Sequence, residues 1–190
     1  MRINKFAPEK QQTPIPYLRT PKMRGINFKP RPSVRSVPIP TRLELITKIE
    51  TIKEENIRAL AALLVLSGCR IDEVIGIRNP MIKRKAEGLY KSKPLRAFQL
   101  EKRTLPSEHY VLTNVPTFKQ RRAQYPLRQV PLFINEAESP FWSIFLEYYN
   151  KIPNEKYMFK FSRQYGHRKI KEYTGYFPHF FRSYRATVLV

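Results

Sequence analysis

Cysteine is nearly absent from this sequence, because Cys69 is the only one among 190 residues. An internal disulfide is therefore impossible, and a reducing compartment is the default expectation. Long apolar runs are absent as well. The apolar stretch 59–66 is too short to cross a bilayer, and the first five residues are not followed by the apolar segment of a signal peptide. We therefore expect a cytoplasmic protein, in the nucleoid or in the cytoplasm of a host cell, without a membrane partner.

Acidic residues are also scarce. The chain has 15 Asp and Glu against 36 Lys and Arg, which gives a net charge of +21 and an isoelectric point near 10.3. Such an excess indicates a polyanionic partner, with nucleic acid as the first choice. A membrane surface is the weaker alternative, because no long basic amphipathic helix is evident. Hydrophobic residues still make up 42% of the chain and aromatic residues 13%, so a folded core is expected.

Residues 1–40 differ in composition from the rest of the chain. They contain eight prolines, nine Lys or Arg and a single acid, Glu9, and their apolar residues follow no period. Such a segment cannot bury enough apolar surface to offset the entropy that it would lose on ordering. We predict an extended arm that is disordered unless it lies on a partner, and a plain tail or linker is the alternative interpretation. The folded domain is placed at residues 41–190.

Residues 57–78 form the most apolar part of the domain. Apolar side chains recur at helical spacing, and Gly68 predicts the end of this helix because glycine tolerates a positive φ. A second short helix, with its isoleucine and valine side chains inward, would hold Arg70 at the tip of a buried helix pair. The simplest role for Arg70 at that tip is an ion pair with Asp72 or Glu73.

The rest of the domain mixes helical and strand patterns. Thr41 and Glu44 form a capping-box pattern that predicts a helix with Leu43, Ile46 and Ile49 inward. The sequence as a whole predicts an α+β fold that is mainly helical, with a small antiparallel sheet. We expect helices at residues 42–53, 139–151 and 162–173, a further helix through residues 179–184, strands at 95–101, 109–115 and 129–133, and a short strand at 157–159.

Three segments resemble the signature motifs of the tyrosine recombinases, the phage-integrase family. Ser67-Gly-Cys-Arg-Ile-Asp-Glu-Val-Ile-Gly-Ile-Arg78 is similar to the first arginine motif of that family. Residues 114–132 resemble the hairpin that carries its mobile catalytic lysine, and Phe177-Pro-His-Phe-Phe-Arg-Ser-Tyr-Arg-Ala-Thr187 resembles its His-x-x-Arg box. The resemblance covers residues 41–190, and it implies a catalytic-domain-like fold that cleaves and rejoins double-stranded DNA during recombination or integration of a mobile element.

The resemblance also implies a role for each matching residue. Arg70, His179 and Arg182 would bind the non-bridging oxygens of the scissile phosphate without a metal or another cofactor. Glu73 would support Arg70, and Lys119 would protonate the leaving 5′-oxygen as a general acid. In a simpler interpretation, Lys119 belongs to a charged hairpin tip that touches the DNA backbone. The hairpin residues expected to contact DNA are Arg121, Arg122 and Arg128.

Two parts of the family pattern are not found in this sequence. A Gly-His box and the nucleophilic tyrosine would follow the last motif, and a helical core-binding domain would precede the first. We therefore expect a catalytic domain that is incomplete at its C-terminal side, and that either self-associates on DNA or takes its nucleophile from a partner chain. Two other hypotheses remain open: a non-catalytic basic protein of a nucleoprotein assembly, and a fragment similar to a type IB topoisomerase.

Overall fold

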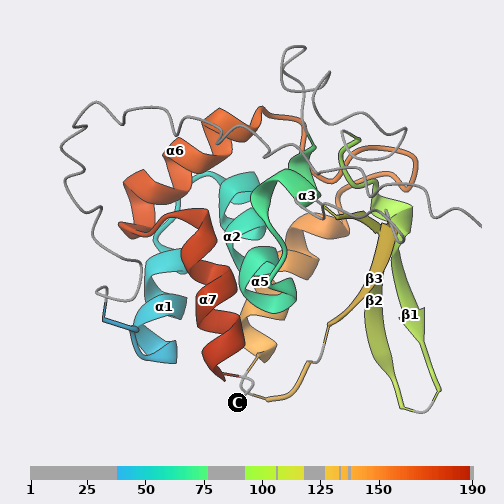
Figure 1. The fold of residues 1–190 in the computed structure, drawn as a ribbon, viewed down its shortest axis with the longest axis horizontal. Helices are drawn as coiled ribbons and strands as arrows, with labels where there is room; N and C mark the ends of the chain where they lie inside the picture. The colour runs from blue at the N-terminus through green and yellow to red at the C-terminus, as the bar shows by residue number, and fades with distance from the viewer. Residues whose placement is uncertain are drawn as a thin grey trace, which may run out of the picture. The chain divides into compact units, whose positions relative to one another are not determined.

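The computed structural model describes residues 38–76, 93–105, 107–117, 127–132, 134–136 and 138–188. These residues form six α-helices and one three-stranded antiparallel sheet, which confirms the predicted α+β class with its helical majority (Figure 1). The helices are α1 (Arg42–Glu50), α2 (Glu55–Ser67), α3 (Ile71–Ile75), α5 (Ser139–Tyr149), α6 (Arg163–Thr174) and α7 (Pro178–Val188). The strands are β1 (Leu100–Arg103), β2 (His109–Pro116) and β3 (Leu127–Leu132), and the short 3-10 helix η2 (Ala97–Gln99) precedes them.

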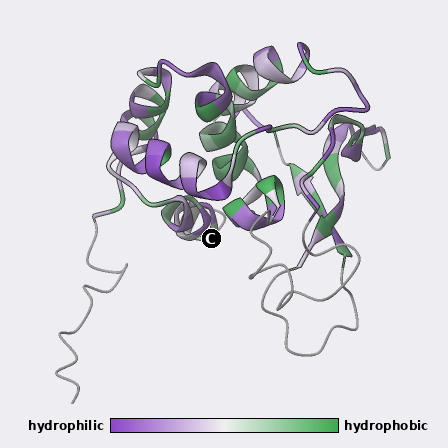
Figure 2. Ribbon diagram, turned by 90° about the horizontal axis from the view of Figure 1, so that it is seen from above, coloured by the Kyte–Doolittle hydropathy of each residue, from purple (hydrophilic) through white to green (hydrophobic). Residues whose placement is uncertain are grey.

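Helix α2 is the centre of the core. Every residue from Ala59 to Leu66 is buried, and α1, α5, α6 and α7 all pack against this helix. Figure 2 shows hydrophobic residues concentrated in the central helices and hydrophilic residues along the outer ones. Gly166 lets α6 approach closely, because a Cβ atom there would lie 3.3 Å from Leu60 of α2 and 3.1 Å from Ile75 of α3. Because other helices surround α2, this helix can be apolar on almost every side.

Helix α1 begins where the capping box predicts. The Thr41 side chain accepts a hydrogen bond from the Glu44 backbone N–H, and the Glu44 carboxylate accepts one from Thr41 N. The inward face agrees with the prediction at Ile49 and at the partly buried Ile46, but not at Leu43. Leu45 and Ile49 are buried together with Ile52, whereas Leu43 is 73% exposed. The helix ends at Glu50 and not at residue 53, and the turn that follows brings Ile52 back into the core in place of the missing helical positions.

The sheet lies to one side of the helices, as Figure 1 shows, and has the order β1-β2-β3. Leu112 is paired with Leu100 on one side and with Val130 on the other. The register shifts between Leu112 and Val115, and Asn114 within this bulge has a φ of +53°, which asparagine tolerates better than most residues. The first predicted strand is too long, because residues 97–99 form η2 and pairing begins only at Leu100.

The C-terminal helices follow the predicted pattern closely. Ser162 caps α6 by accepting a hydrogen bond from Tyr165 N, and Phe180, Phe181 and Tyr184 anchor α7 in the core. Residues 157–159 do not form the expected strand, because Tyr157 makes only an isolated bridge with Arg96. No helix in the described ranges has the length and apolar character that a bilayer crossing requires.

Candidate functional site

The corner between α2 and α3 is built from the first of the three motifs. Gly68 ends α2 with a φ of +59°, and its N–H donates to the Leu64 carbonyl. The Ser67 hydroxyl accepts a hydrogen bond from Cys69 N, which fixes the chain as it leaves the helix. Arg70 then occupies the N-cap position of α3. The local sequence therefore holds Arg70 at a sharp turn between two buried helices.

Glu73 is the acid around which this corner is organised. Its side chain is fully buried, and one oxygen accepts hydrogen bonds from Arg70 N at 2.8 Å and from Arg128 Nη2 at 2.7 Å. The other oxygen lies 3.1 Å from Arg70 Nη1. A buried carboxylate is costly unless it is paired and hydrogen-bonded, and here two guanidinium groups meet that need. The pairing agrees both with the simple structural role predicted for Arg70 and with a supporting role for Glu73.

Arg182 reaches the same corner from α7. Its Nη1 donates to the carbonyl oxygen of Gly68 at 3.2 Å, two residues before Arg70. Arg182 thereby joins Arg70, Glu73 and Arg128 in a group that we call the arginine corner. Three guanidinium groups and one carboxylate leave this corner with a net charge of +2, and the side chains of Arg70 and Arg128 remain about one third exposed.

Arg185 fixes α7 one turn beyond Arg182. Its aliphatic stem packs on Gly68, with Cγ 3.4 Å from the position of a Cβ on that glycine. Its guanidinium lies 2.9 Å from the Glu138 carboxylate, and both side chains are almost fully buried. Arg42 of α1 approaches the same carboxylate at 3.7 Å. Sequence reasoning missed this ion pair, because Glu138 precedes α5 and nothing local links it to α7.

Of the other predicted site residues, the structure describes His179 and Arg128. His179 lies exposed in the first turn of α7, one helical turn before Arg182, so both project from neighbouring positions on one side of this helix. Arg128 on β3, expected to contact DNA, forms an ion pair with Glu73 and keeps about one third of its side chain exposed, so its contact with DNA stays a prediction. The remaining three, Lys119, Arg121 and Arg122, lie outside the described residues.

A second group of polar and aromatic residues links α6 to α3 and to the start of α7. Arg163 forms an ion pair with Asp72, which precedes Glu73 on α3. The ring of His167 lies 5.5 Å from that of Phe177, and Lys171 lies over the same ring. Burial, together with the nearby charges of Arg163 and Lys171, lowers the pKa of His167 below its usual value. The three motifs gave no reason to single out His167, although its position in a run of basic residues was a usable signal.

Three tyrosines in and between α6 and α7 are engaged in packing or hydrogen bonds. Tyr184 is 3% exposed, and burial raises the pKa of its hydroxyl. Tyr176 stacks on Phe180 with ring centroids 4.3 Å apart, and Tyr173 donates to Glu54. A nucleophilic hydroxyl must reach the phosphorus and lose its proton, and the buried position of Tyr184 opposes both.

Within the described ranges, no three His, Cys, Asp or Glu side chains gather as a metal site would require. No known family model, curated protein or solved structure gives a significant match to this chain.

Proposed function

We propose that this chain binds double-stranded DNA through the arginine corner, as a protein similar to the tyrosine recombinases. The observation that carries the proposal is the hydrogen bond from Arg182 to Gly68. It joins two motifs that are more than 100 residues apart in the sequence, and it gathers their arginines at one exposed and positively charged corner. The net charge of +21 supports an anionic polymer as the ligand.

The chemistry of the corner suits a phosphate group. A guanidinium presents several N–H donors in a fixed plane, and it can bond two phosphate oxygens at once. Glu73 binds Arg70 through both its backbone N–H and its guanidinium. The conformational freedom of the Arg70 side chain is therefore already restricted before a ligand binds. Arg182 would supply the second guanidinium, and His179, exposed one turn away, would bind a further oxygen.

Salt-dependent DNA binding tests the proposal. We expect fluorescence anisotropy with a labelled duplex to give an affinity that falls steeply with salt, with a slope that shrinks by about 0.9 for each phosphate group that is no longer bound. Arg70→Ala and Arg182→Ala should each weaken binding far more than Lys53→Ala, which removes an exposed charge from the turn between α1 and α2. The melting temperature of each variant controls for damage to the fold.

Equal losses for all three variants would contradict a phosphate pocket. A diffuse basic surface predicts similar, additive effects wherever a charge is removed, whereas a pocket predicts unequal ones. Loss of binding that tracks the loss of thermal stability would mean that Arg70 and Arg182 act only through the fold.

Non-catalytic DNA binding is the second candidate, and the burial of Tyr184 favours it. We expect that a nicked suicide substrate forms no covalent complex through this residue. On a denaturing gel, Tyr184→Phe should leave the amount of any protein–DNA adduct unchanged. An adduct that disappears in this variant would assign the nucleophile to Tyr184 and overturn the expectation.

A further inference from the structure

Two of the exposed aromatic side chains in the described ranges line one pocket. Phe98 is 48% exposed and Tyr157 is 38% exposed, while most other aromatic rings lie in the core or against it. The pocket has a volume of about 380 Å³, within the range of small-molecule sites. Single exposed apolar side chains are common, but exposed rings that gather at one pocket indicate a surface that a ligand covers.

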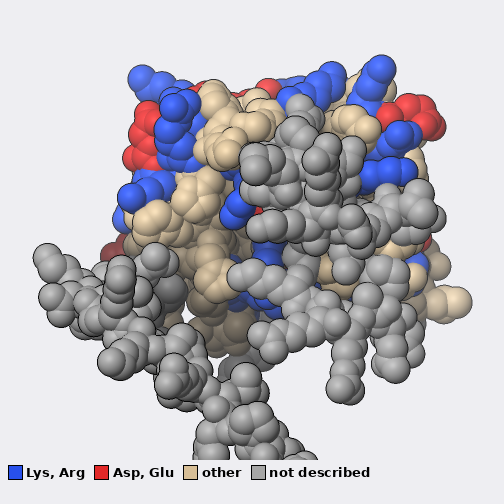
Figure 3. Space-filling model, turned by 45° about the horizontal axis from the view of Figure 1, so that its top comes forward, with Lys and Arg blue, Asp and Glu red and all other residues tan. Residues whose placement is uncertain are grey.

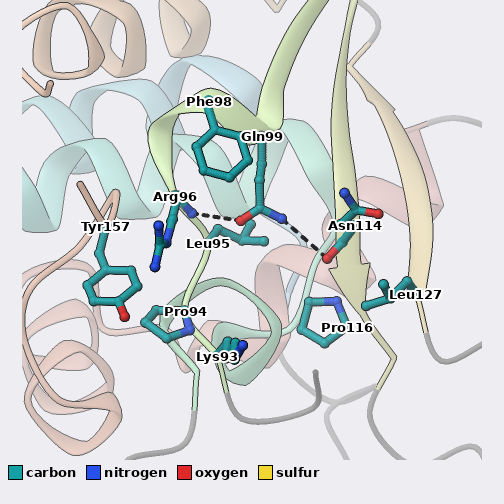
Figure 4. Close-up of a pocket in the computed structure, with 10 residues that line it drawn as sticks. All are labelled: Lys93, Pro94, Leu95, Arg96, Phe98, Gln99, Asn114, Pro116, Leu127 and Tyr157. Carbon is teal, nitrogen blue, oxygen red and sulfur yellow. Dashed lines mark hydrogen bonds between the residues drawn. The ribbon is translucent and has the colours of Figure 1, made fainter. Parts of the chain in front are cut away.

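The pocket combines rings with positive charge. Figure 4 shows the Arg96 side chain between Phe98 and Tyr157, and the guanidinium lies over the Tyr157 ring, 5.4 Å from its centroid. Lys93 lies on the side opposite Phe98, and Asn114 borders the pocket from β2. Aromatic planes, a guanidinium plane, a cation and an amide thus surround one cavity.

The backbone around the pocket is fixed by Gln99. Its Nε2 donates to the carbonyls of Thr113 and Asn114, at 2.9 and 3.4 Å, and its Oε1 accepts from Arg96 N at 2.8 Å. These bonds tie η2 to the bulge of β2, where Asn114 has its positive φ. Hydrogen bonds therefore fix the backbone on the side of the pocket where η2 meets β2.

The pocket lies close in the chain to the arginine corner. Leu127 lines it, and the next residue on β3 is Arg128, which bonds Glu73. Leu95, also in the lining, donates its N–H to the carbonyl of Val74, the neighbour of Glu73 on α3. The backbone that lines the pocket is thus joined directly to the backbone that carries the arginine corner.

We propose that this pocket binds one unstacked nucleotide of a nucleic acid strand. The base would stack on the exposed rings and on the Arg96 guanidinium, and its phosphate would be balanced by Lys93. Stacking on aromatic and guanidinium planes is how proteins hold unpaired bases, because every base offers a flat face. The proposal rests on the proposed function, because it takes nucleic acid as the partner, and it adds a preference for unpaired nucleotides that the arginine corner does not supply.

The test compares a perfect duplex with the same duplex carrying a single-nucleotide bulge, and with a short oligothymidine. We expect the native protein to bind the bulged duplex several-fold more tightly than the perfect one. Removing one stacking interaction should cost about tenfold in affinity for the bulged duplex. Phe98→Leu and Tyr157→Leu should therefore abolish the preference, while Phe98→Tyr and Tyr157→Phe, which keep the rings, should retain it.

Leu105→Ala provides the matched control, because Leu105 is exposed and does not line the pocket. Equal affinity of the native protein for the bulged and perfect duplexes would overturn the nucleotide pocket and leave the proposed function standing. Binding to oligothymidine that depends on Phe98, without any binding to duplex, would support the nucleotide pocket and contradict the proposed binding of duplex DNA. A preference that survives both leucine variants would also overturn the assignment to this pocket.

Discussion

The pKa of His167 depends on the positive charges around it and can be measured. Its ring is partly buried against Phe177, and Arg163 and Lys171 lie near enough to disfavour a further positive charge. Burial and these two cations hold its pKa below the ordinary value of 6.5. The folded protein therefore binds a proton at His167 less readily than the unfolded chain does.

We expect the imidazole of His167 to titrate below its usual range in NMR spectra of the unbound protein. Because the unfolded chain takes up the proton first, the contribution of His167 to stability should fall as the pH drops through 6.5 and toward the folded pKa. Lys171→Ala should move the titration upward, since it removes one of the two repelling charges. DNA should do the same, since it adds negative charge. An unchanged titration in the presence of saturating DNA would show that no phosphate comes near this part of α6.

Gly68 ends α2 and lies next to Arg185 of α7, so the positions of both helices depend on this residue. Its φ of +59° is strained for any residue with a Cβ, and that Cβ would lie in ordinary van der Waals contact with Arg185. Gly175, the C-cap of α6, has a φ of +77° with nothing within 4 Å of a Cβ. The two glycines therefore share the backbone strain but not the contact with α7.

We expect Gly68→Leu and Gly175→Leu each to lower the free energy of unfolding by about 1–2 kcal/mol from left-handed strain alone. Gly68→Leu should in addition displace α7 and with it Arg182, because atoms beyond Cβ would overlap Arg185, so only this variant should weaken DNA binding. Urea unfolding and anisotropy measure the two effects separately. Equal DNA affinity in both variants would mean that the position of α7 on Gly68 does not matter for binding.

The ion pair between Glu138 and Arg185 holds α7 to the start of α5. Both side chains are almost fully buried, so removing one charge leaves the other without its counter-ion. We expect Glu138→Gln to destabilise the fold by about 3–5 kcal/mol in urea unfolding. Glu108→Gln, which breaks an exposed pair with Lys102 on the sheet, should have little effect. Similar stability of the two variants would show that Arg185 is well solvated in solution.

The sequence predicts those elements whose signals are local. The capping box at Thr41 and the glycine at position 68 mark helix ends because the backbone bonds they serve lie within three or four residues. Leu43 was misplaced because a short helix with isoleucine or leucine at several positions has more than one plausible inward face. Residues 97–99 were misplaced because the Gln99 side chain donates to backbone carbonyls of β2, an interaction that no local pattern reveals.

The candidate site likewise contains residues that sequence motifs indicated and contacts that only the fold reveals. The motifs indicated Arg70, Glu73 and Arg182 together, and the structure brings them to one corner. The hydrogen bond from Arg128 to Glu73 spans 55 positions in the chain, and the pair of Glu138 with Arg185 spans 47, so neither could be found without the fold. Whether these residues act on DNA stays a prediction.

At the scale of the whole molecule, positive charge is the dominant property. Figure 3 shows Lys and Arg side chains gathered along the rim of one face, with acidic side chains between them. Many of the described acids are taken up in ion pairs with neighbouring cations, such as Glu55 with Lys151 and Asp72 with Arg163. We expect the charges left over to act at long range and to favour association with a polyanion, with an effect that salt screens.

Residues 1–36 carry nine of the 36 Lys and Arg and only one acid, so they should contribute strongly to DNA binding. A deletion that ends at Ser36 keeps Pro40, which is buried just before α1, and keeps the cap at Thr41. We expect the shortened protein to melt at nearly the same temperature, because it retains the core around α2. Its affinity for duplex DNA should fall, and the dependence of log affinity on log salt should become shallower by about 0.9 for each phosphate that these residues would otherwise bind.

A shortened protein that binds with the same slope would show that these nine charges do not touch the duplex. One that unfolds would show that residues 1–36 belong to the folded domain.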